Sequence, residues 1–184
     1  MDPWVVEVLR EGYVIPFHHT PPLSDTPISL GSYSPGSIRG RALETALQLK
    51  GAVEPAPCSP GCYSRMFVVP KATGGWRPII DLSILNHSVV KTRFHMETIQ
   101  SVLRSVRRND WMISIDLKDV YLQVPMHPRS HKFLRFIAGG QAWQFRVLCF
   151  GLTTAPQVFT RVMAPVSSLL HQLGSGYCGI WTTG

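Results

Sequence analysis

The last third of the sequence contains no acidic residue, because Asp119 is the final carboxylate in a chain of 184 residues. A segment without carboxylates cannot by itself supply the oxygen ligands that a pair of divalent metal ions requires. The whole chain has 18 Lys and Arg against 11 Asp and Glu, a net charge of +7 and a pI near 9.6. This balance suits a polyanionic partner, nucleic acid first, and composition alone fits an inert basic surface equally well. The basic residues that follow the last carboxylate are Arg129, Lys132, Arg135, Arg146 and Arg161.

Cysteine is also scarce, and its spacing disfavours a zinc site. Cys58 and Cys62 lie in a turn-like stretch, but no second Cys or His pair follows at zinc spacing. We therefore expect reduced thiols, in an intracellular protein. The sequence starts without a signal-like segment and has no apolar run of membrane length, so we expect no membrane partner. Hydrophobic residues make up 45%, which excludes wholesale disorder.

The first third of the chain predicts two helices separated by an irregular arm. Residues 3–11 are expected to form a short helix, with Pro3 in its first turn. Residues 12–36 are rich in Pro, Ser, Thr and Gly, which predicts an extended arm. Residues 37–50 show helical periodicity that ends before Gly51.

The remainder predicts two antiparallel hairpins mixed with helices, and hence an α+β fold. We expect a first hairpin from strands 63–70 and 76–82, and a second from 132–137 and 141–148 around the turn 138–140. Three further elements are expected: a helix over 97–107, a short buried strand over 111–116 and a helix over 155–173.

Asp116 is the strongest candidate for a chemical role. It ends the predicted buried strand, where a carboxylate is costly unless a partner such as a divalent cation compensates its charge. Asp119 follows three residues later, and is also suited to cap the next turn. The alternative for this segment is a helix-capping aspartate without any metal.

Two further features are suited to binding a nucleotide. Phe150 and Gly151 form a turn directly before a helix, and the glycine allows close approach of a ligand to the backbone. Lys71 and Arg77 flank the first hairpin, at a spacing that suits two cations on a triphosphate. Taken singly, the lysine is also explained as solvated and the arginine as packing beside Trp76.

Together these segments resemble the reverse transcriptases of retroelements. The matching blocks, in order, are Trp76-Arg77-Pro78-Ile-Ile-Asp81-Leu82 with Leu85-Asn86, then Asp116-Leu-Lys-Asp119-Val-Tyr121, then Phe150-Gly151-Leu152 with Ala155-Pro156. The likeness covers residues 4–173 and is closest to DIRS-like retrotransposons with a tyrosine recombinase, then to gypsy-type elements. It implies the fingers and part of the palm of a right-hand polymerase. It divides the chain into an N-terminal helix, arm and fingers helix (1–57), a partial fingers and palm region (58–173) and a tail (174–184).

The resemblance also implies roles for individual residues. Asp116 matches the first metal-binding, catalytic aspartate. Tyr121 matches the aromatic residue that excludes a 2′-hydroxyl from the sugar site. The other matches concern the nucleotide: two fingers cations on the phosphates, two positions whose backbone lies under the triphosphate, and the turn beside the nascent base pair. These residues are, in that order, Lys71 and Arg77, Asp119 and Val120, and Phe150 and Gly151.

The sequence departs from the family pattern in three ways. Val120 replaces the usual alanine, which adds bulk, and Cys149 replaces the usual proline, which we expect to loosen the turn. The Tyr-x-Asp-Asp hairpin with the second and third catalytic aspartates is missing. We hypothesise a frameshift near Gly174, because codons can be chosen for residues 174–184 that encode Tyr-Leu-Asp-Asp in another frame. The DNA across this position tests that hypothesis, and divergence or an exon boundary is the alternative.

The family reaction is RNA-directed DNA synthesis with Mg²⁺, on an RNA or DNA template–primer and from deoxynucleoside triphosphates. The resemblance implies that missing palm, thumb and RNase H segments come from the rest of a polyprotein. We expect this chain alone to be inactive, because its magnesium site is incomplete. The alternatives are a non-catalytic nucleic-acid-binding remnant and an unstable pseudogene product with an open sheet edge.

Overall fold

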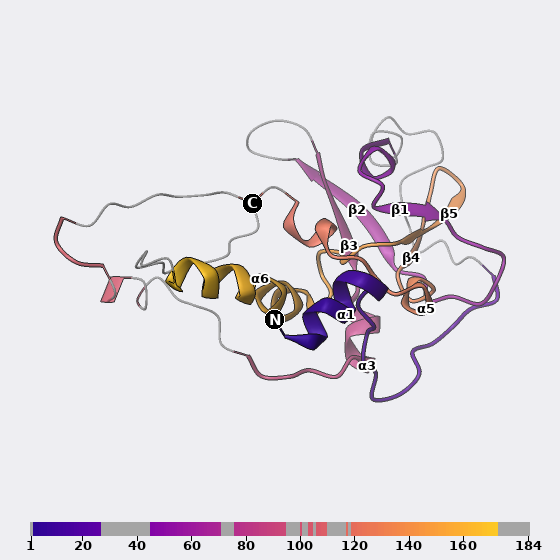
Figure 1. Ribbon diagram of the computed structural model, residues 1–184. Helices are drawn as coiled ribbons and strands as arrows, with labels where there is room; N and C mark the ends of the chain where they lie inside the picture. Colours follow the sequence, from indigo (N-terminus) through magenta and orange to yellow (C-terminus); the bar gives the residue numbers. More distant parts are fainter. Residues whose placement is uncertain are drawn as a thin grey trace.

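The computed structural model describes residues 2–26, 45–70, 76–94, 100, 103–104, 106–109, 117 and 119–172. Figure 1 shows the strands gathered at one side of the molecule and α6 extending away from them. Residues 45–49 add a helical turn before the first strand. In chain order the elements are α1 (Pro3–Glu11), β1 (Val53–Pro55), β2 (Arg65–Pro70), β3 (Trp76–Asp81), α3 (Ser83–Ser88), the 3-10 helix η1 (Val120–Gln123), α5 (Pro128–His131), β4 (Arg135–Ala138), β5 (Gln141–Phe145) and α6 (Ala155–Gln172).

The first of two sheets is three-stranded and antiparallel, with its strands in the order β1-β5-β4. The β4–β5 hairpin closes through Gly139 and Gly140, at φ 59° and 83°. Positive φ at both central residues is the type I′ geometry that matches the twist of the flanking strands. Phe136, Trp143 and Phe145 of this hairpin are buried, so the sheet contributes directly to the core.

The second sheet is the β2–β3 hairpin, whose register pairs Arg65 with Asp81 and Pro70 with Trp76. The backbone joins it to the first sheet, because the Ser64 amide donates to the Arg135 carbonyl over 2.8 Å. At the same open end of the hairpin, Asp81 accepts hydrogen bonds from the amide and hydroxyl of Ser83, which starts α3 directly after β3. These bonds lower the pKa of Asp81.

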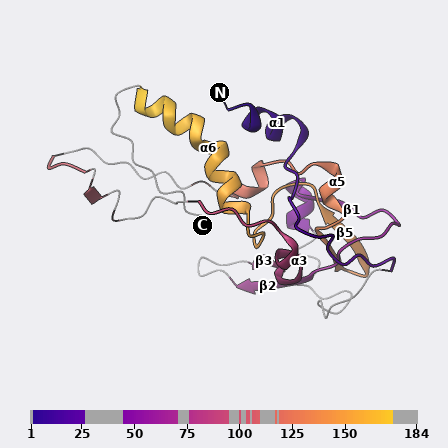
Figure 2. The same cartoon turned by 90° about the horizontal axis from the view of Figure 1, so that it is seen from below.

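Helix α1 lies beside the first turns of α6, as both views show (Figures 1 and 2). Asp2 caps α1 by accepting from the Trp4 amide over 3.0 Å, and also pairs with Arg161 of α6 over 2.8 Å. The Arg161 guanidinium stacks 4.1 Å from the centroid of the Trp4 ring. The cap and the helix–helix contact therefore share one carboxylate.

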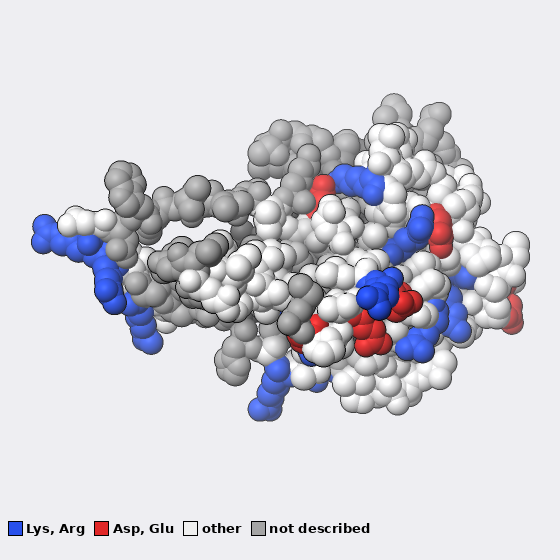
Figure 3. Space-filling view, in the orientation of Figure 1, with Lys and Arg blue, Asp and Glu red and all other residues white. Residues whose placement is uncertain are grey.

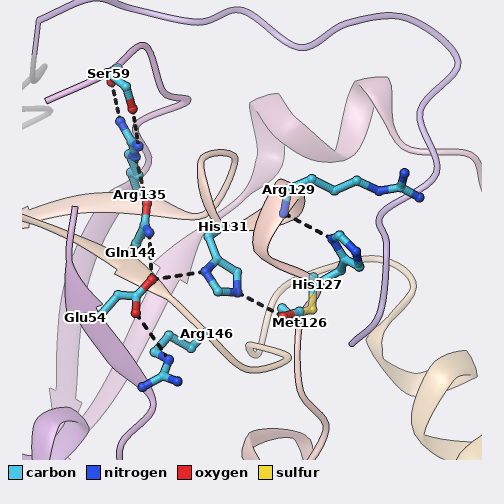
Figure 4. Close-up of polar contacts among 9 residues, drawn as sticks. All are labelled: Glu54, Ser59, Met126, His127, Arg129, His131, Arg135, Gln144 and Arg146. Atoms are coloured by element: carbon cyan, nitrogen blue, oxygen red, sulfur yellow. Dashed lines mark hydrogen bonds and ion pairs between the residues drawn. The ribbon is translucent and has the colours of Figure 1, made fainter. Parts of the chain in front are cut away.

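A chain of polar side chains crosses the three-stranded sheet (Figure 4). Arg135 is only 1% exposed, and its guanidinium donates to the carbonyl and hydroxyl oxygens of Ser59 and to Gln144. Gln144 in turn donates to Glu54 over 2.8 Å. A buried guanidinium is costly unless its donors are satisfied. The Gln144 amide therefore links the guanidinium to the carboxylate of Glu54, on β1 at the opposite edge of the sheet.

Glu54 also joins the sheet to α5. Its carboxylate lies 3.1 Å from His131 Nδ1 and 3.3 Å from Arg146 Nε, while His131 Nε2 lies 2.9 Å from the Met126 carbonyl oxygen. Oxygen atoms thus face both ring nitrogens, and the imidazole joins Glu54 of β1 to the backbone just before α5. Burial acts to raise the pKa of Glu54, but the hydrogen bonds from Gln144 and His131 outweigh it and the pKa is lowered.

The structure confirms the mixed α+β class and both hairpins. Helix α1 has the predicted bounds, the described part of the arm (12–26) has no helix or strand, and α6 begins at the predicted residue. The predicted strand over 111–116 lies outside the described residues. Residues 106–107 are not helical, so the predicted end of helix 97–107 is wrong. Sequence periodicity did not predict β1, α3, η1 or α5, because each is too short to show a period.

Within the described ranges, no helix combines the length and apolar character that a membrane crossing needs.

Cys58, Cys62 and Cys149 are free thiols, as expected, and burial raises the pKa of Cys62. The second half of α6 extends beyond the core, with Val166 and Leu169 exposed.

We predict that Glu54→Gln lowers the free energy of unfolding at pH 7 by about 1 kcal/mol, discounted because 34% of the side chain is exposed. The lowered pKa of Glu54 means that its contribution is complete above the ordinary value of 4.5 and is lost as the pH falls through the folded-state pKa. The variant should therefore lose part of the acid dependence of stability. Urea denaturation between pH 3 and pH 7 measures this, with exposed Glu7→Gln as the control. Equal pH profiles for the two variants would contradict the role of Glu54.

Candidate nucleotide-binding site

The structure describes five of the eight predicted site residues in full: Asp119, Val120, Tyr121, Phe150 and Gly151. Asp116 and Lys71 lie outside the described residues. Arg77 is placed through its backbone, which pairs with Val69 across the first hairpin. The roles predicted for these three side chains therefore stay predictions.

Asp119 has an unusual backbone conformation for a residue with a side chain. Its φ of 54° and ψ of 36° place it in the left-handed region, directly before η1. A left-handed residue followed by a right-handed turn directs successive amides to one side, an arrangement that suits anions. Asp119 occupies the capping position of η1, but its side chain makes no capping bond there. Its carboxylate instead pairs with Lys50, at 2.8 Å from Nζ to Oδ2.

Tyr121 lies in an aromatic cluster formed by elements that are distant in the sequence. Its ring centroid is 5.0 Å from that of Phe150 and 5.8 Å from that of Phe159 in α6. The residue is 8% exposed, so packing fixes its position. The structure thus brings together Tyr121 and Phe150, which the sequence assigned separately to the sugar and to the nascent base pair.

Gly151 is required by both its backbone and its surroundings. Its φ is 93°, and a Cβ at this position would lie 2.9 Å from the Ile80 carbonyl oxygen of β3. The turn is held from outside by Asn86 of α3. The Asn86 amide donates to the Gly151 carbonyl over 2.8 Å and accepts from the Thr153 amide over 2.9 Å. The end of β3 and the helix α3 that follows it therefore fix the turn that carries Phe150.

The two residues that depart from the family pattern are both buried, Val120 at 4% and Cys149 at 1% exposed. Burial raises the pKa of the Cys149 thiol to about 12. Cys149 is thus a small apolar core residue. The bonds from Asn86 hold the following turn in place, so the loosening expected from loss of proline is opposed by α3.

The described residues do not form a magnesium site. Among them, no group of three or more His, Cys, Asp or Glu is placed to hold a metal ion. Asp119, the described carboxylate next to the site, is already paired with Lys50. Neither Asp119 nor its described neighbours therefore supply the ligand set for a metal ion.

The sequence did not predict the contacts of Lys50 and Asn86 at this site. Asn86 belongs to the first matching block, but the resemblance assigned it no role. A side-chain amide can both donate and accept hydrogen bonds, which suits it to hold a backbone turn. Lys50 directly precedes Gly51, a helix-ending position, but nothing in the sequence connects it with Asp119, which is 69 positions later. Such a pairing depends on the tertiary fold.

The sequence that contains this candidate site matches a known class of polymerase. The sequence pattern of the family described as reverse transcriptase (RNA-dependent DNA polymerase) matches residues 69–178. The chain belongs to this family. Its mixed α+β fold is that of the fingers and palm of such enzymes.

Among individual relatives, the chain is 31% identical over 88 residues to the enzymatic polyprotein of Cestrum yellow leaf curling virus, covering 47% of this chain and 14% of that protein. It is 29% identical over 98 residues to the Pol polyprotein from transposon gypsy of Drosophila melanogaster, covering 53% and 9%. A foamy viral protease-reverse transcriptase in complex with dsDNA aligns with a TM-score of 0.68 at 20% identity, covering 92% of this chain and 36% of that one. This chain thus spans only a small part of its relatives.

We predict that Gly151→Ala destabilises the protein by about 2–3 kcal/mol, because the new methyl group meets the Ile80 carbonyl in a backbone conformation that suits glycine. Gly140→Ala is the matched control. Gly140 has a similar φ of +83°, but no atom lies within 4 Å of where its Cβ would be, so we expect a loss of only about 1 kcal/mol. Urea denaturation compares the two. A loss at Gly151 no larger than at Gly140 would show that the contact with Ile80 does not restrict the turn.

Proposed function

We propose that this chain is the fingers and partial palm of a retroelement reverse transcriptase, and that it contributes to RNA-directed DNA synthesis. The proposal is carried by one observation: Tyr121 packs against Phe150 on a turn that Gly151 and Asn86 fix, beside the left-handed Asp119. In this proposal Tyr121 and Phe150 lie beside the sugar and base of a deoxynucleotide, and the backbone after Asp119 faces its triphosphate, as the family resemblance implies.

We propose an RNA or DNA template–primer as the nucleic-acid partner. The described residues include exposed cations, and Figure 3 shows Lys and Arg atoms gathered at the left edge of the molecule. Foamy viral protease-reverse transcriptases of similar fold have been solved in complex with dsDNA and with an RNA/DNA hybrid. Exposed basic residues of this chain include Lys91, Arg93, Arg104, Arg108 and Arg129.

The proposed cofactor is Mg²⁺, which in this family supplies charge stabilisation for nucleotidyl transfer. Asp116 is the proposed first ligand, and Lys71 and Arg77 are the proposed phosphate cations. Because no carboxylate follows Asp119, we propose that the chain alone is inactive and that other segments of a polyprotein complete the enzyme. We further propose an intracellular location and a kinship with DIRS-like elements, which the quoted motifs support.

A non-catalytic nucleic-acid-binding remnant is the second candidate. It is favoured by the basic segment after Asp119 together with the missing carboxylate pair. The two candidates agree on binding and differ only in whether a completed polyprotein restores synthesis.

We predict that nucleic-acid binding is electrostatic and nearly independent of sequence, because the matched motifs address phosphates and not base edges. Affinity for two unrelated RNA–DNA duplexes, measured by filter binding, should differ little. It should fall about tenfold or more between 50 and 200 mM salt, as several released counterions require. Strong preference for one duplex with a weak salt effect would contradict this.

We also predict that the purified chain extends no primer with Mg²⁺ or Mn²⁺. Asp116 is the single matched catalytic carboxylate, and one aspartate cannot hold two metal ions in the required geometry. Labelled primer on an RNA template, with Asp116→Asn as the matched variant, provides the assay. Extension that disappears in Asp116→Asn would overturn the proposed inactivity.

A further inference from the structure

The Lys50–Asp119 ion pair connects two segments that are distant in the chain. Lys50 follows the helical turn 45–49, and Asp119 opens the η1 turn of the candidate site. Their side chains are 39% and 24% exposed, so water screens the pair only in part. The family resemblance assigns no role to either side chain, since it concerns only the backbone of Asp119.

The structure anchors Lys50 firmly before it reaches Asp119. The Ala52 amide donates to the Leu47 carbonyl over 3.0 Å, and the Gly51 amide donates to Gln48 over 2.8 Å. Gly51 has a φ of 61°, so these bonds form a glycine-based helix end. Leu47 and Ala52 are buried at 3% and 0% exposed, which fixes both sides of the turn in the core.

Asp119 presents an electrostatic problem to the proposed nucleotide site. Its backbone is expected to face a triphosphate, yet its carboxylate carries the same sign of charge as the phosphates. Like charges a few ångströms apart repel strongly near a protein surface, where screening is weaker than in bulk water. A cation bound to the carboxylate would remove this repulsion and leave the backbone amides available to an anion.

We propose that Lys50 is a positioning residue that neutralises Asp119 and holds the 119–121 turn for a nucleoside triphosphate. This inference rests on the proposed function, because it takes the 119–121 turn as the triphosphate site. Lys50 acts through Asp119 and does not itself contact the phosphates. The ion pair thereby couples the 45–50 segment, next to β1, to the turn that carries Tyr121.

The test titrates the full chain with 2′-deoxythymidine triphosphate in magnesium buffer and follows the backbone amides of Val120 and Tyr121 by NMR. Lys50→Met removes the charge but keeps the carbon stem, and should weaken triphosphate binding about threefold or more. Arg146→Met is the matched control: it removes the same charge from another surface ion pair, that with Glu54. It should change the affinity much less. Lys50→Arg should retain binding.

A second experiment tests whether Lys50 acts by neutralising the Asp119 carboxylate. The double variant Lys50→Met/Asp119→Asn has no carboxylate to neutralise, and asparagine tolerates the left-handed conformation. It should recover most of the affinity that Lys50→Met loses. If the double variant binds as weakly as Lys50→Met, Lys50 contacts phosphate directly and the positioning role is wrong.

Hydrogen exchange of the Leu122 amide gives a ligand-free readout, because this amide donates to the Asp119 carbonyl over 2.9 Å. Lys50→Met should speed its exchange, while the Phe145 amide, bonded to Leu134, stays unchanged as a check on the fold. Binding by the wild type with equal affinities for Lys50→Met and Arg146→Met overturns this inference alone. Absence of any shift at residues 120–121 in the wild type overturns both this inference and the proposed nucleotide site.

Discussion

The three-stranded sheet depends on one constraint, the burial of the Arg135 guanidinium. A cation that is 1% exposed needs its donors satisfied, and Gln144 connects it to the carboxylate of Glu54. This requirement fixes β1 beside β5 and β5 beside β4, in a register that pairs Glu54 with Gln144 and Gln144 with Arg135. A shift by one residue would turn the side chains of the shifted strand to the opposite face.

The candidate site inherits its geometry from this arrangement. Since β1 is fixed in the sheet, the preceding Lys50 is placed where it reaches Asp119. On the other side, β3 leads directly into α3, and Asn86 of α3 holds the turn at Gly151. Elements without chemistry of their own thus bring together η1, the 150–153 turn and α6, whose Phe159 completes the ring cluster around Tyr121.

The proposed site of this reverse transcriptase family member is made of backbone and rings more than of reactive side chains. Nucleotidyl transfer is largely a matter of positioning and of charge stabilisation by metal ions. In such a reaction the protein's own part is to orient the substrates. In the described part of this chain the proposed site consists of backbone and rings, and the chain itself has no carboxylate side chain after Asp119.

The sequence alone determined the α+β class, both hairpins, the bounds of α1 and the start of α6, because turn residues and periodicity act locally. Motif order also grouped Asp119, Tyr121, Phe150 and Gly151 as one predicted site, of which the structure places Tyr121 beside Phe150. Tertiary structure decided what the sequence could not: the Lys50–Asp119 pair, the Asn86 clamp and the compensation of Arg135 by Glu54. Each joins a side chain to a group in a separate part of the chain, and the distances between them are set by packing and strand register, which no local pattern encodes. The short elements β1, α3 and η1 likewise form because their neighbours hold them.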